Sequence, residues 1–142
     1  MITNNILNLI RGEEGCRLKL YYDSLGKPTI GYGHLCGATE NYTTITQQQA
    51  DDIFRNDVAN AEKDAVSIFP NLNTLSETRQ GVLVSMSFEL GKNRLLGFHH
   101  FINAVNIVNW SQAVSEMYDS VWAKQVPDRV EELANLLQRG EW

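Results

Sequence analysis

The spacing of apolar residues changes along this chain, and that change constrains its fold more than any other feature. Between Arg17 and Asp23, apolar and polar side chains alternate, as in a strand with one buried face. The stretch SLGKP (24–28) predicts a turn, and TIGYGHL (29–35) predicts a second strand. The segment therefore predicts a β-hairpin, and NYTTI (41–45) predicts a third short strand nearby.

Helical spacing governs the regions on either side of this hairpin. Apolar residues at positions 6–10 predict a short first helix that runs on until Gly15 ends or bends it. A long helix is predicted over 46–69, because Thr46 and Gln49 form a capping-box pattern at its start. About twenty helical residues would reach about 30 Å, which is long enough to link two lobes.

The second half of the chain predicts only helices. Ser76 is the expected N-cap of a helix that continues to Leu90, apolar on nearly every side and therefore buried, with Gly91 as its stop. Three further helices are expected, carrying the apolar residues between Phe98 and Val105, those between Trp110 and Met117 after an Asn109 cap, and those from Pro127 to Leu137 before Gly140. The predicted fold class is α+β, with a small hairpin-containing lobe and a larger all-helical lobe.

Composition excludes several classes of protein. A chain of 142 residues with 43% apolar and 20% charged residues is typical of one globular domain, or of two small lobes that share a core. The net charge of -5 argues against binding to nucleic acid, and the sequence predicts neither a membrane span nor a secretory signal. Without such a signal, Cys16 and Cys36 are expected to be reduced, buried thiols rather than a disulfide.

The hairpin region also carries groups that suit chemistry on a sugar. Glu13 and Glu14 precede Asp23, and the alternation of the second strand places Thr29, Gly31 and Gly33 on one nearly bare face. A bare strip beside carboxylates suits a saccharide ring, and glycoside hydrolysis needs two carboxyl groups that flank the scissile bond. On spacing alone, however, these carboxylates are more simply surface charges, and periodicity does not choose between Glu13 and Glu14.

A resemblance to a known family favours the catalytic interpretation. The stretch EEGCRLKLYYDSLGKPTIGYGHL resembles the signature of the bacteriophage lysozymes, the muramidase endolysins of the T-even type. In that family a glutamate before glycine, an aspartate nine residues later and a threonine six beyond form the catalytic set, and these positions fall on Glu14, Asp23 and Thr29. The similarity continues through ITQQQADDIFRNDV, LVSMSFELG, LLGFHHFINAV and NWSQAVSEMYDSVWAKQVPDRV, and so covers essentially the whole chain.

The resemblance implies a function, a mechanism and a domain organisation. The expected activity is hydrolysis of the β-1,4 bond between N-acetylmuramic acid and N-acetylglucosamine in peptidoglycan, with inversion at the anomeric carbon. Glu14 is the expected general acid, its pKa raised by neighbouring Glu13, while Asp23 and Thr29 hold the attacking water. Residues 1–142 would form one lysozyme-like domain, with 13–59 as the smaller lobe, 1–12 and 60–142 as the helical lobe, and a cleft between them. No cofactor and no metal are expected.

Supporting and substrate-binding roles also follow from the resemblance. His34 is expected to pair with Asp57, which would raise the pKa of His34, and Arg129 is expected near the catalytic glutamate. Leu35 and Phe88 match positions that line the saccharide cleft, and Gly33 of the bare strip joins them as a predicted substrate-binding residue.

Three departures from the family are also visible. Phe101 and Glu116 stand where the family carries two polar cleft residues, so no binding role is carried onto them. The acidic balance is the third departure, because enzymes that attack anionic walls are often basic.

Two other functions stay open at this point. A cell-wall amidase or peptidase could use Cys16 with His34, or a metal, and a non-catalytic wall-binding module could keep the fold. For the muramidase, the expected partner is bacterial peptidoglycan, the expected state is a monomer, and the expected role is lysis of the host. The enzyme would stay in the host cytoplasm until a holin-type pore, made by the phage, gave it access to the wall.

Overall fold

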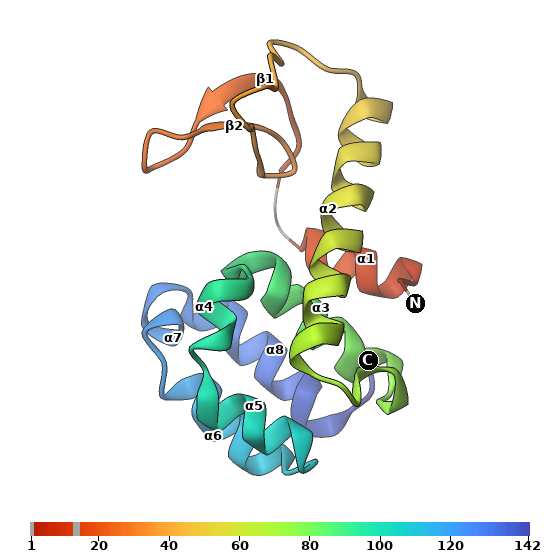
Figure 1. Cartoon of the computed structure of the whole chain (residues 1–142), viewed down its shortest axis with the longest axis vertical. Helices are drawn as coiled ribbons and strands as arrows, with labels where there is room; N and C mark the ends of the chain where they lie inside the picture. The colour runs from red at the N-terminus through yellow and green to blue at the C-terminus, as the bar shows by residue number, and fades with distance from the viewer. Residues whose placement is uncertain (1, 13–14) are drawn as a thin grey trace. The chain divides into compact units, whose positions relative to one another are not determined.

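The computed structural model describes residues 2–12 and 15–142, and these divide into two compact units. Residues 11–60 form the sheet unit, and residues 1–10 with 61–142 form the helical unit. Figure 1 labels most of the helices and strands of both units. The fold class is α+β, as predicted: an N-terminal helix, a three-stranded antiparallel sheet, a long helix and then a mostly helical region.

The sheet unit contains three antiparallel strands in the order β1-β2-β3, namely β1 (Arg17–Tyr22), β2 (Pro28–Gly31) and β3 (His34–Leu35). The predicted β1–β2 hairpin is confirmed, but the prediction of one strand over 29–35 is wrong. The chain turns back at Tyr32 and Gly33, so that Ile30 pairs with His34. The third strand is therefore β3, and around residue 44 the described chain forms only an isolated bridge between Lys19 and Thr44.

Two glycines explain why the alternation failed to reveal this turn. Gly31 and Gly33 have φ values of 66° and 77°, a region that side chains other than glycine rarely adopt, so together they reverse the strand. Tyr32, which separates the two glycines in the sequence, donates its hydroxyl to Asp51 Oδ1 on α2 (Gln47–Ile68) at 3.1 Å. Ile30 and His34 do share a face, as the alternation predicted, but they do so across a hairpin rather than along one strand.

The long helix α2 (Gln47–Ile68) begins at the capping box that the sequence predicts. The Gln49 amide donates to the Thr46 hydroxyl at 3.1 Å, and the Thr46 amide donates to the Gln49 side chain at 2.8 Å. The first half of α2 belongs to the sheet unit, where Ala50 packs with Ile30 and Ile45 in its apolar core.

The remaining helices belong to the helical unit, apart from the last residue of the first one. They are α1 (Asn4–Arg11), a 3₁₀ turn η1 (Leu72–Thr74), α3 (Glu77–Leu90), α4 (Lys92–Leu96), α5 (His99–Asn106), α6 (Trp110–Tyr118), α7 (Val121–Gln125) and α8 (Pro127–Arg139). The sequence predicted three helices after α3, and the described chain has five, because the short α4 and α7 have too few turns to show a period. The first helix ends at Arg11, before the predicted Gly15, and Gly12 follows with a φ of 51°.

The predicted helix ends of this unit are confirmed by their hydrogen bonds. Ser76 accepts from the Arg79 amide at 3.3 Å, and Asn109 accepts from the Gln112 amide at 3.1 Å. Gly91 and Gly140 end α3 and α8 with φ values of 78° and 72°.

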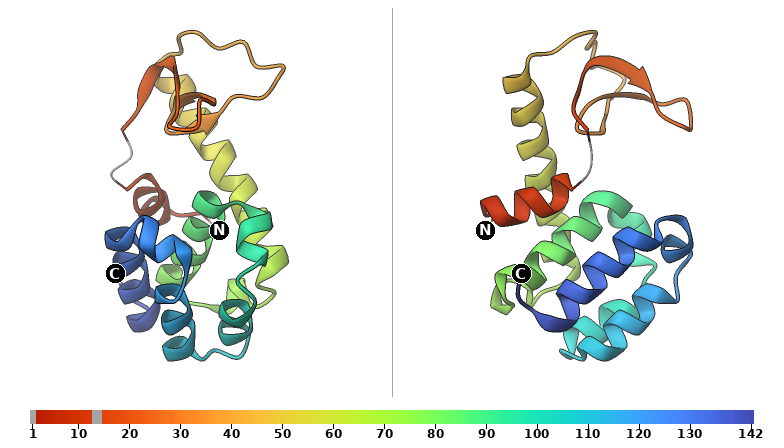
Figure 2. Two further views of the ribbon diagram at one scale, coloured as in Figure 1. Left: turned by 90° about the vertical axis from the view of Figure 1, so that its left-hand side faces the viewer. Right: turned by 180° about the vertical axis from the view of Figure 1, so that it is seen from behind.

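The core of the helical unit forms around α3, which is buried on nearly all sides as predicted. Helix α8 packs against α3 and α6, and α6 packs against α5, an arrangement that both views in Figure 2 display. None of the helices in residues 2–12 and 15–142 is both long and apolar enough to cross a lipid bilayer.

Candidate active site

Asp23 stands at the end of β1, where its carboxylate organises the β1–β2 turn. Oδ1 accepts hydrogen bonds from the amides of Leu25 and Lys27, both at 2.9 Å, and the Asp23 amide donates to the Lys27 carbonyl at 2.9 Å. This is the local side-chain bonding by which aspartate favours turns. The carboxylate is half-buried, and its second oxygen has no hydrogen-bond partner among the residues that the structure describes.

Thr29 lies on β2 and is tied to the same turn. Its hydroxyl donates to the Lys27 carbonyl at 2.9 Å, and the residue is 3% exposed. The peptide groups of Lys27 thus connect the two side chains: the amide binds Asp23, and the carbonyl binds Thr29. The structure therefore brings two of the three predicted catalytic residues together in one turn.

Glu14, the predicted general acid, and its neighbour Glu13 lie outside the described residues. Their predicted roles, and the position of Arg129 beside Glu14, stay predictions. Arg129 itself is held within the helical unit, where its guanidinium donates to the Leu9 carbonyl at 2.9 Å and to the Ser85 hydroxyl at 2.8 Å. It also forms an ion pair with Glu132 at 2.6 Å.

The predicted bare strip of Thr29, Gly31 and Gly33 is wrong, because the β2–β3 turn separates its members. Gly31 is buried toward the core of the sheet unit, where an added Cβ would lie 3.7 Å from the Ala50 Cβ. Gly33 is exposed at the turn. Leu35 instead lies directly opposite Thr29, and its side chain is 52% exposed.

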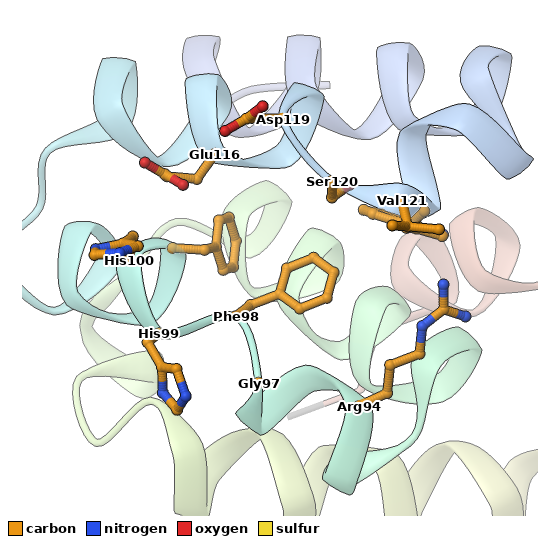
Figure 3. Close-up of a pocket in the computed structure, with 11 residues that line it drawn as sticks. Arg94, Gly97, Phe98, His99, His100, Glu116, Asp119, Ser120 and Val121 are labelled. Carbon is orange, nitrogen blue, oxygen red and sulfur yellow. The ribbon is translucent and has the colours of Figure 1, made fainter.

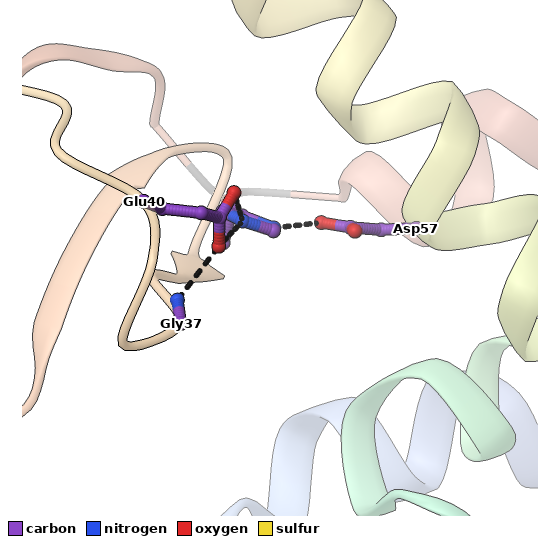
Figure 4. Close-up of polar contacts among 4 residues, drawn as sticks. Gly37, Glu40 and Asp57 are labelled. Carbon is purple, nitrogen blue, oxygen red and sulfur yellow. Dashed lines mark hydrogen bonds and ion pairs between the residues drawn. The ribbon is translucent and has the colours of Figure 1, made fainter.

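His34 lies between the carboxylates of Glu40 and Asp57, both of which Figure 4 labels. Its Nδ1 lies 2.8 Å from Asp57 Oδ2 on α2, the partner that the family resemblance predicts. Its Nε2 lies 3.1 Å from both carboxylate oxygens of Glu40, which the sequence reasoning missed. The Gly37 amide donates to the Glu40 carboxylate at 2.6 Å. A glycine three residues before a carboxylate is therefore the sequence signal that could have indicated this turn.

The two carboxylates and the burial of the imidazole act in opposite directions on its protonation. Burial disfavours the charged imidazolium, but the hydrogen bonds and charges of Asp57 and Glu40 outweigh it and raise the pKa of His34, as predicted. Burial also raises the pKa of Asp57, against the lowering influence of His34, whereas the Gly37 amide lowers the pKa of Glu40. Both ring nitrogens of His34 thus contact carboxylates, and neither is left free to activate Cys16.

The two cysteines are free and half-buried rather than fully buried. Cys16 directly precedes Arg17, which pairs with Gly31 at one end of β2, while the Cys36 amide bonds to the Pro28 carbonyl at the other end. These ends are about 10 Å apart at about 3.3 Å per residue, beyond the Cα separation of about 7 Å that a disulfide tolerates. The sheet therefore excludes an intramolecular Cys16–Cys36 bond.

A pocket of about 270 Å³ lies within the helical unit, between the α4–α5 connection and the α6–α7 connection. Figure 3 shows its lining, which includes Phe98, His100, Glu116 and Asp119. Phe101, one of the two residues that depart from the polar cleft positions of the family, is 1% exposed and packs edge-on against Phe98. Glu116, the other departure, is half-buried in the pocket wall and accepts from Gln112 at 2.7 Å.

Phe88, a predicted substrate-binding residue, is half-buried on α3. It does not line the pocket described above, and its predicted role stays a prediction.

Comparison with known proteins places the chain in a family. The chain is 27% identical to the pre-baseplate central spike protein Gp5 of Enterobacteria phage T4, over 96% of the chain but only 28% of that protein. It is 25% identical to the probable T4-type lysozyme 1 of Dictyostelium discoideum, over 98% of the chain and 96% of that protein. It is 30% identical to the endolysin of Salmonella phage P22, over 89% of the chain and 86% of that protein.

A family-level comparison agrees with these relatives. Residues 11–141 match the family described as phage lysozyme. This range includes the turn that joins Asp23 to Thr29, the contacts of His34 with Glu40 and Asp57, and the whole of α8. On the strength of that match and of the P22 relative, the chain belongs to the phage lysozyme family, a family of peptidoglycan-hydrolysing glycosidases.

Proposed function

We propose that this protein is a muramidase that cleaves the β-1,4 bond between N-acetylmuramic acid and N-acetylglucosamine by an inverting mechanism. The observation that carries the proposal is that Lys27 holds both side chains in a chain of the phage lysozyme family: its amide donates to the carboxylate of Asp23, and its carbonyl accepts from the hydroxyl of Thr29. A fixed carboxylate next to a hydroxyl suits the binding and activation of one water molecule.

The hydrogen bonds of Asp23 and Thr29 support a different part for each group in the proposed activation of water. Because Oδ1 of Asp23 is held by two amides, Oδ2 is the oxygen that would accept a proton from water. Because the Thr29 hydroxyl donates its hydrogen to Lys27, its lone pairs would accept the second hydrogen of that water. The water oxygen would then direct a lone pair at the anomeric carbon.

Glu14 completes the reaction as the general acid. It would protonate the leaving oxygen as the glycosidic bond breaks, while Asp23 takes a proton from the attacking water, so charge and atoms balance. Inverting enzymes separate the two carboxyl groups by about 6.5–9.5 Å to leave room for the water. The product formed first from a β-linked substrate would be the α-anomer.

The test compares adjacent carboxylates on purified peptidoglycan. Glu14→Gln should remove the release of new reducing ends by several orders of magnitude, since it deletes the acid that acts in the transition state. Glu13→Gln makes the same change in charge one residue away and should stay within about one order of magnitude of the parent. Parental activity in Glu14→Gln, release of free peptides instead of reducing ends, or a β-anomer as first product would contradict the proposal.

We also infer a role in lysis of a bacterial host. In this proposal the enzyme, as a monomer, waits in the cytoplasm and reaches the peptidoglycan only after a phage-made pore opens the inner membrane. The support is the family membership together with the endolysin relative. Cells that produce the protein alone should stay intact and lyse when a pore-forming protein is co-expressed, and equal lysis in both cultures would refute the route.

A further inference from the structure

Tyr21, Thr29 and Leu35 lie in one row across the sheet. Tyr21 pairs with Thr29 and Thr29 pairs with Leu35, so the three side chains share a face. That face is opposite to the one on which Ile30 enters the apolar core. Asp23 follows Tyr21 by two residues and continues the same ladder through its bond to Lys27, so the row belongs to the face that carries the proposed water-activating pair.

Arg17 places a positive charge beside this row. Its guanidinium carbon lies 4.3 Å from the centre of the Tyr21 ring, and the Arg17 side chain is exposed. A stacked guanidinium uses its flat face for the ring and keeps its N–H donors free at the edge. Among the residues that the structure describes, none forms a hydrogen bond or ion pair with those donors.

We propose that Arg17 binds a carboxylate of the peptide-bearing glycan and makes the enzyme selective for the anionic polymer over a neutral one. This inference rests on the function proposed above, since it names the substrate group that this site recognises. The planar fork of arginine matches a carboxylate with two parallel hydrogen bonds.

The charge of the whole protein gives a local cation a function. At a net charge of -5 the protein repels an anionic polymer over distances longer than a hydrogen bond. A guanidinium held on the sheet face that carries Asp23 and Thr29 would offset that repulsion where the substrate is proposed to bind.

Tyr21 acts in this scheme as a positioning residue. By stacking, it restricts the rotamers of a long side chain that would otherwise lose its freedom on binding the substrate. Tyr21→Phe keeps the ring and should behave as the parent does. Tyr21→Leu removes the ring without changing the charge and should reproduce part of the loss caused by substitution of Arg17.

The experiment varies one charge on the enzyme and the charges on the substrate. Native sacculi are compared with sacculi whose carboxylates have been converted chemically to neutral amides, with the parent, Arg17→Gln and Arg55→Gln as enzymes. Arg55 is an exposed arginine of α2, so its substitution makes the same change in net charge away from the Arg17–Tyr21 pair.

The expected result is a loss specific to one enzyme and one substrate. Arg17→Gln should raise KM on native sacculi about fivefold with kcat within about twofold, because a contact away from the reacting atoms contributes to binding in ground state and transition state alike. The parent should lose a similar factor on amidated sacculi, and Arg17→Gln should lose little more there. Arg55→Gln should keep the parent's preference for native sacculi.

A binding readout keeps this inference separate from the catalytic one. Sedimentation of the Glu14→Gln protein with native and amidated sacculi measures binding without turnover, and adding Arg17→Gln should weaken it about fivefold on native sacculi only. If Arg17→Gln, folded by circular dichroism, keeps the parental preference for native sacculi in both assays, the inference is wrong. If the parent cleaves neither polymer, the proposed function fails, and the sedimentation assay still decides the role of Arg17.

Discussion

The sheet unit and the helical unit are each stabilised internally by a different kind of interaction. Of the twelve largest fully buried side chains in the described residues, only Phe54 and Ile30 belong to the sheet unit. The helical unit contains the other ten, among them Trp122 and Phe69. A small unit buries a smaller share of its surface, so apolar burial alone stabilises it less.

Hydrogen bonds of polar side chains, to other side chains and to the backbone, supply what the sheet unit lacks in apolar core. His34 joins the sheet to α2 through Asp57, and Asp23 organises the β1–β2 turn. Asp23 and Thr29, two of the proposed catalytic residues, therefore lie in the unit where polar groups define the geometry. The helical unit is therefore stabilised mainly by its apolar core. The sheet unit has a smaller apolar core and contributes oriented polar groups.

The largest expected effect tests whether the polar groups of the sheet unit act in catalysis. Asp23→Asn should lower the rate of peptidoglycan hydrolysis by several orders of magnitude, because an amide cannot take the proton from water. The turn should survive, since the amide oxygen of Asn can still accept from the amides of Leu25 and Lys27. Reducing-end release measures the activity, and thermal unfolding measures the stability.

A matched control and a clear failure accompany this test. Asp52→Asn, on an exposed position of α2, makes the same chemical change away from the turn and should retain activity. An Asp23→Asn protein with near-parental activity would remove the aspartate from the mechanism. A protein that loses its fold instead would mean that the turn depends on the charge of the carboxylate.

The next effect is on stability alone, and it tests whether the apolar core stabilises the helical unit. Leu133→Ala on α8 should lower the free energy of unfolding by about 2–5 kcal/mol, because the side chain is 0% exposed and leaves a cavity. Leu96→Ala in the same unit, where the leucine is 41% exposed, should cost less than about 1 kcal/mol. Chemical denaturation measures both, and equal losses would contradict an apolar core as the main source of stability in the helical unit.

The smallest effect concerns the polar connection between sheet and helix, and it depends on pH. Because the pKa of His34 is raised in the folded protein, its stabilising contribution is complete below the unfolded-state value of about 6.5 and is lost as pH rises through the folded-state value. The lowered pKa of Glu40 gives a contribution that is present above about pH 4.3 and is lost as pH falls. The raised pKa of Asp57 gives a contribution that also declines as pH rises.

His34→Gln should therefore destabilise the protein most between about pH 5 and 6.5, by about 1.5–3 kcal/mol, as is typical for hydrogen bonds to charged groups. The difference from the parent should shrink toward pH 9. His99→Gln, which removes an exposed imidazole of the helical unit, is the matched control. Urea denaturation of the three proteins across this range gives the answer, and a His34→Gln difference that grows with pH would have the wrong sign.

The two units also differ in how well the sequence predicted them. In the helical unit the caps at Ser76 and Asn109 and the glycine stops at Gly91 and Gly140 were all predicted, because each is a local hydrogen bond or a local backbone conformation. In the sheet unit the turn at Tyr32 and Gly33 was missed, because glycines fit an alternating pattern without requiring it.

In the candidate site, too, some contacts were predicted and others were missed. The resemblance supplied Asp23 and Thr29 by position, and it supplied the His34–Asp57 pair that the structure contains. It did not supply Glu40, whose contact with His34 depends on the path of the loop between them. Nor did it supply the Lys27 linkage, since no pattern in the sequence states which carbonyl a threonine hydroxyl will reach.

By itself the sequence determined the fold class, the long α2 with its capping box and the buried character of α3. These depend on interactions within a few residues of each other, or on the burial of an apolar stripe that periodicity displays. Only the tertiary structure decided that β2 turns back at two glycines, that Glu40 shares His34 with Asp57, and that Tyr21, Thr29 and Leu35 form one row. Strand register and loop path depend on contacts between distant segments, and one sequence does not encode those contacts in any local pattern.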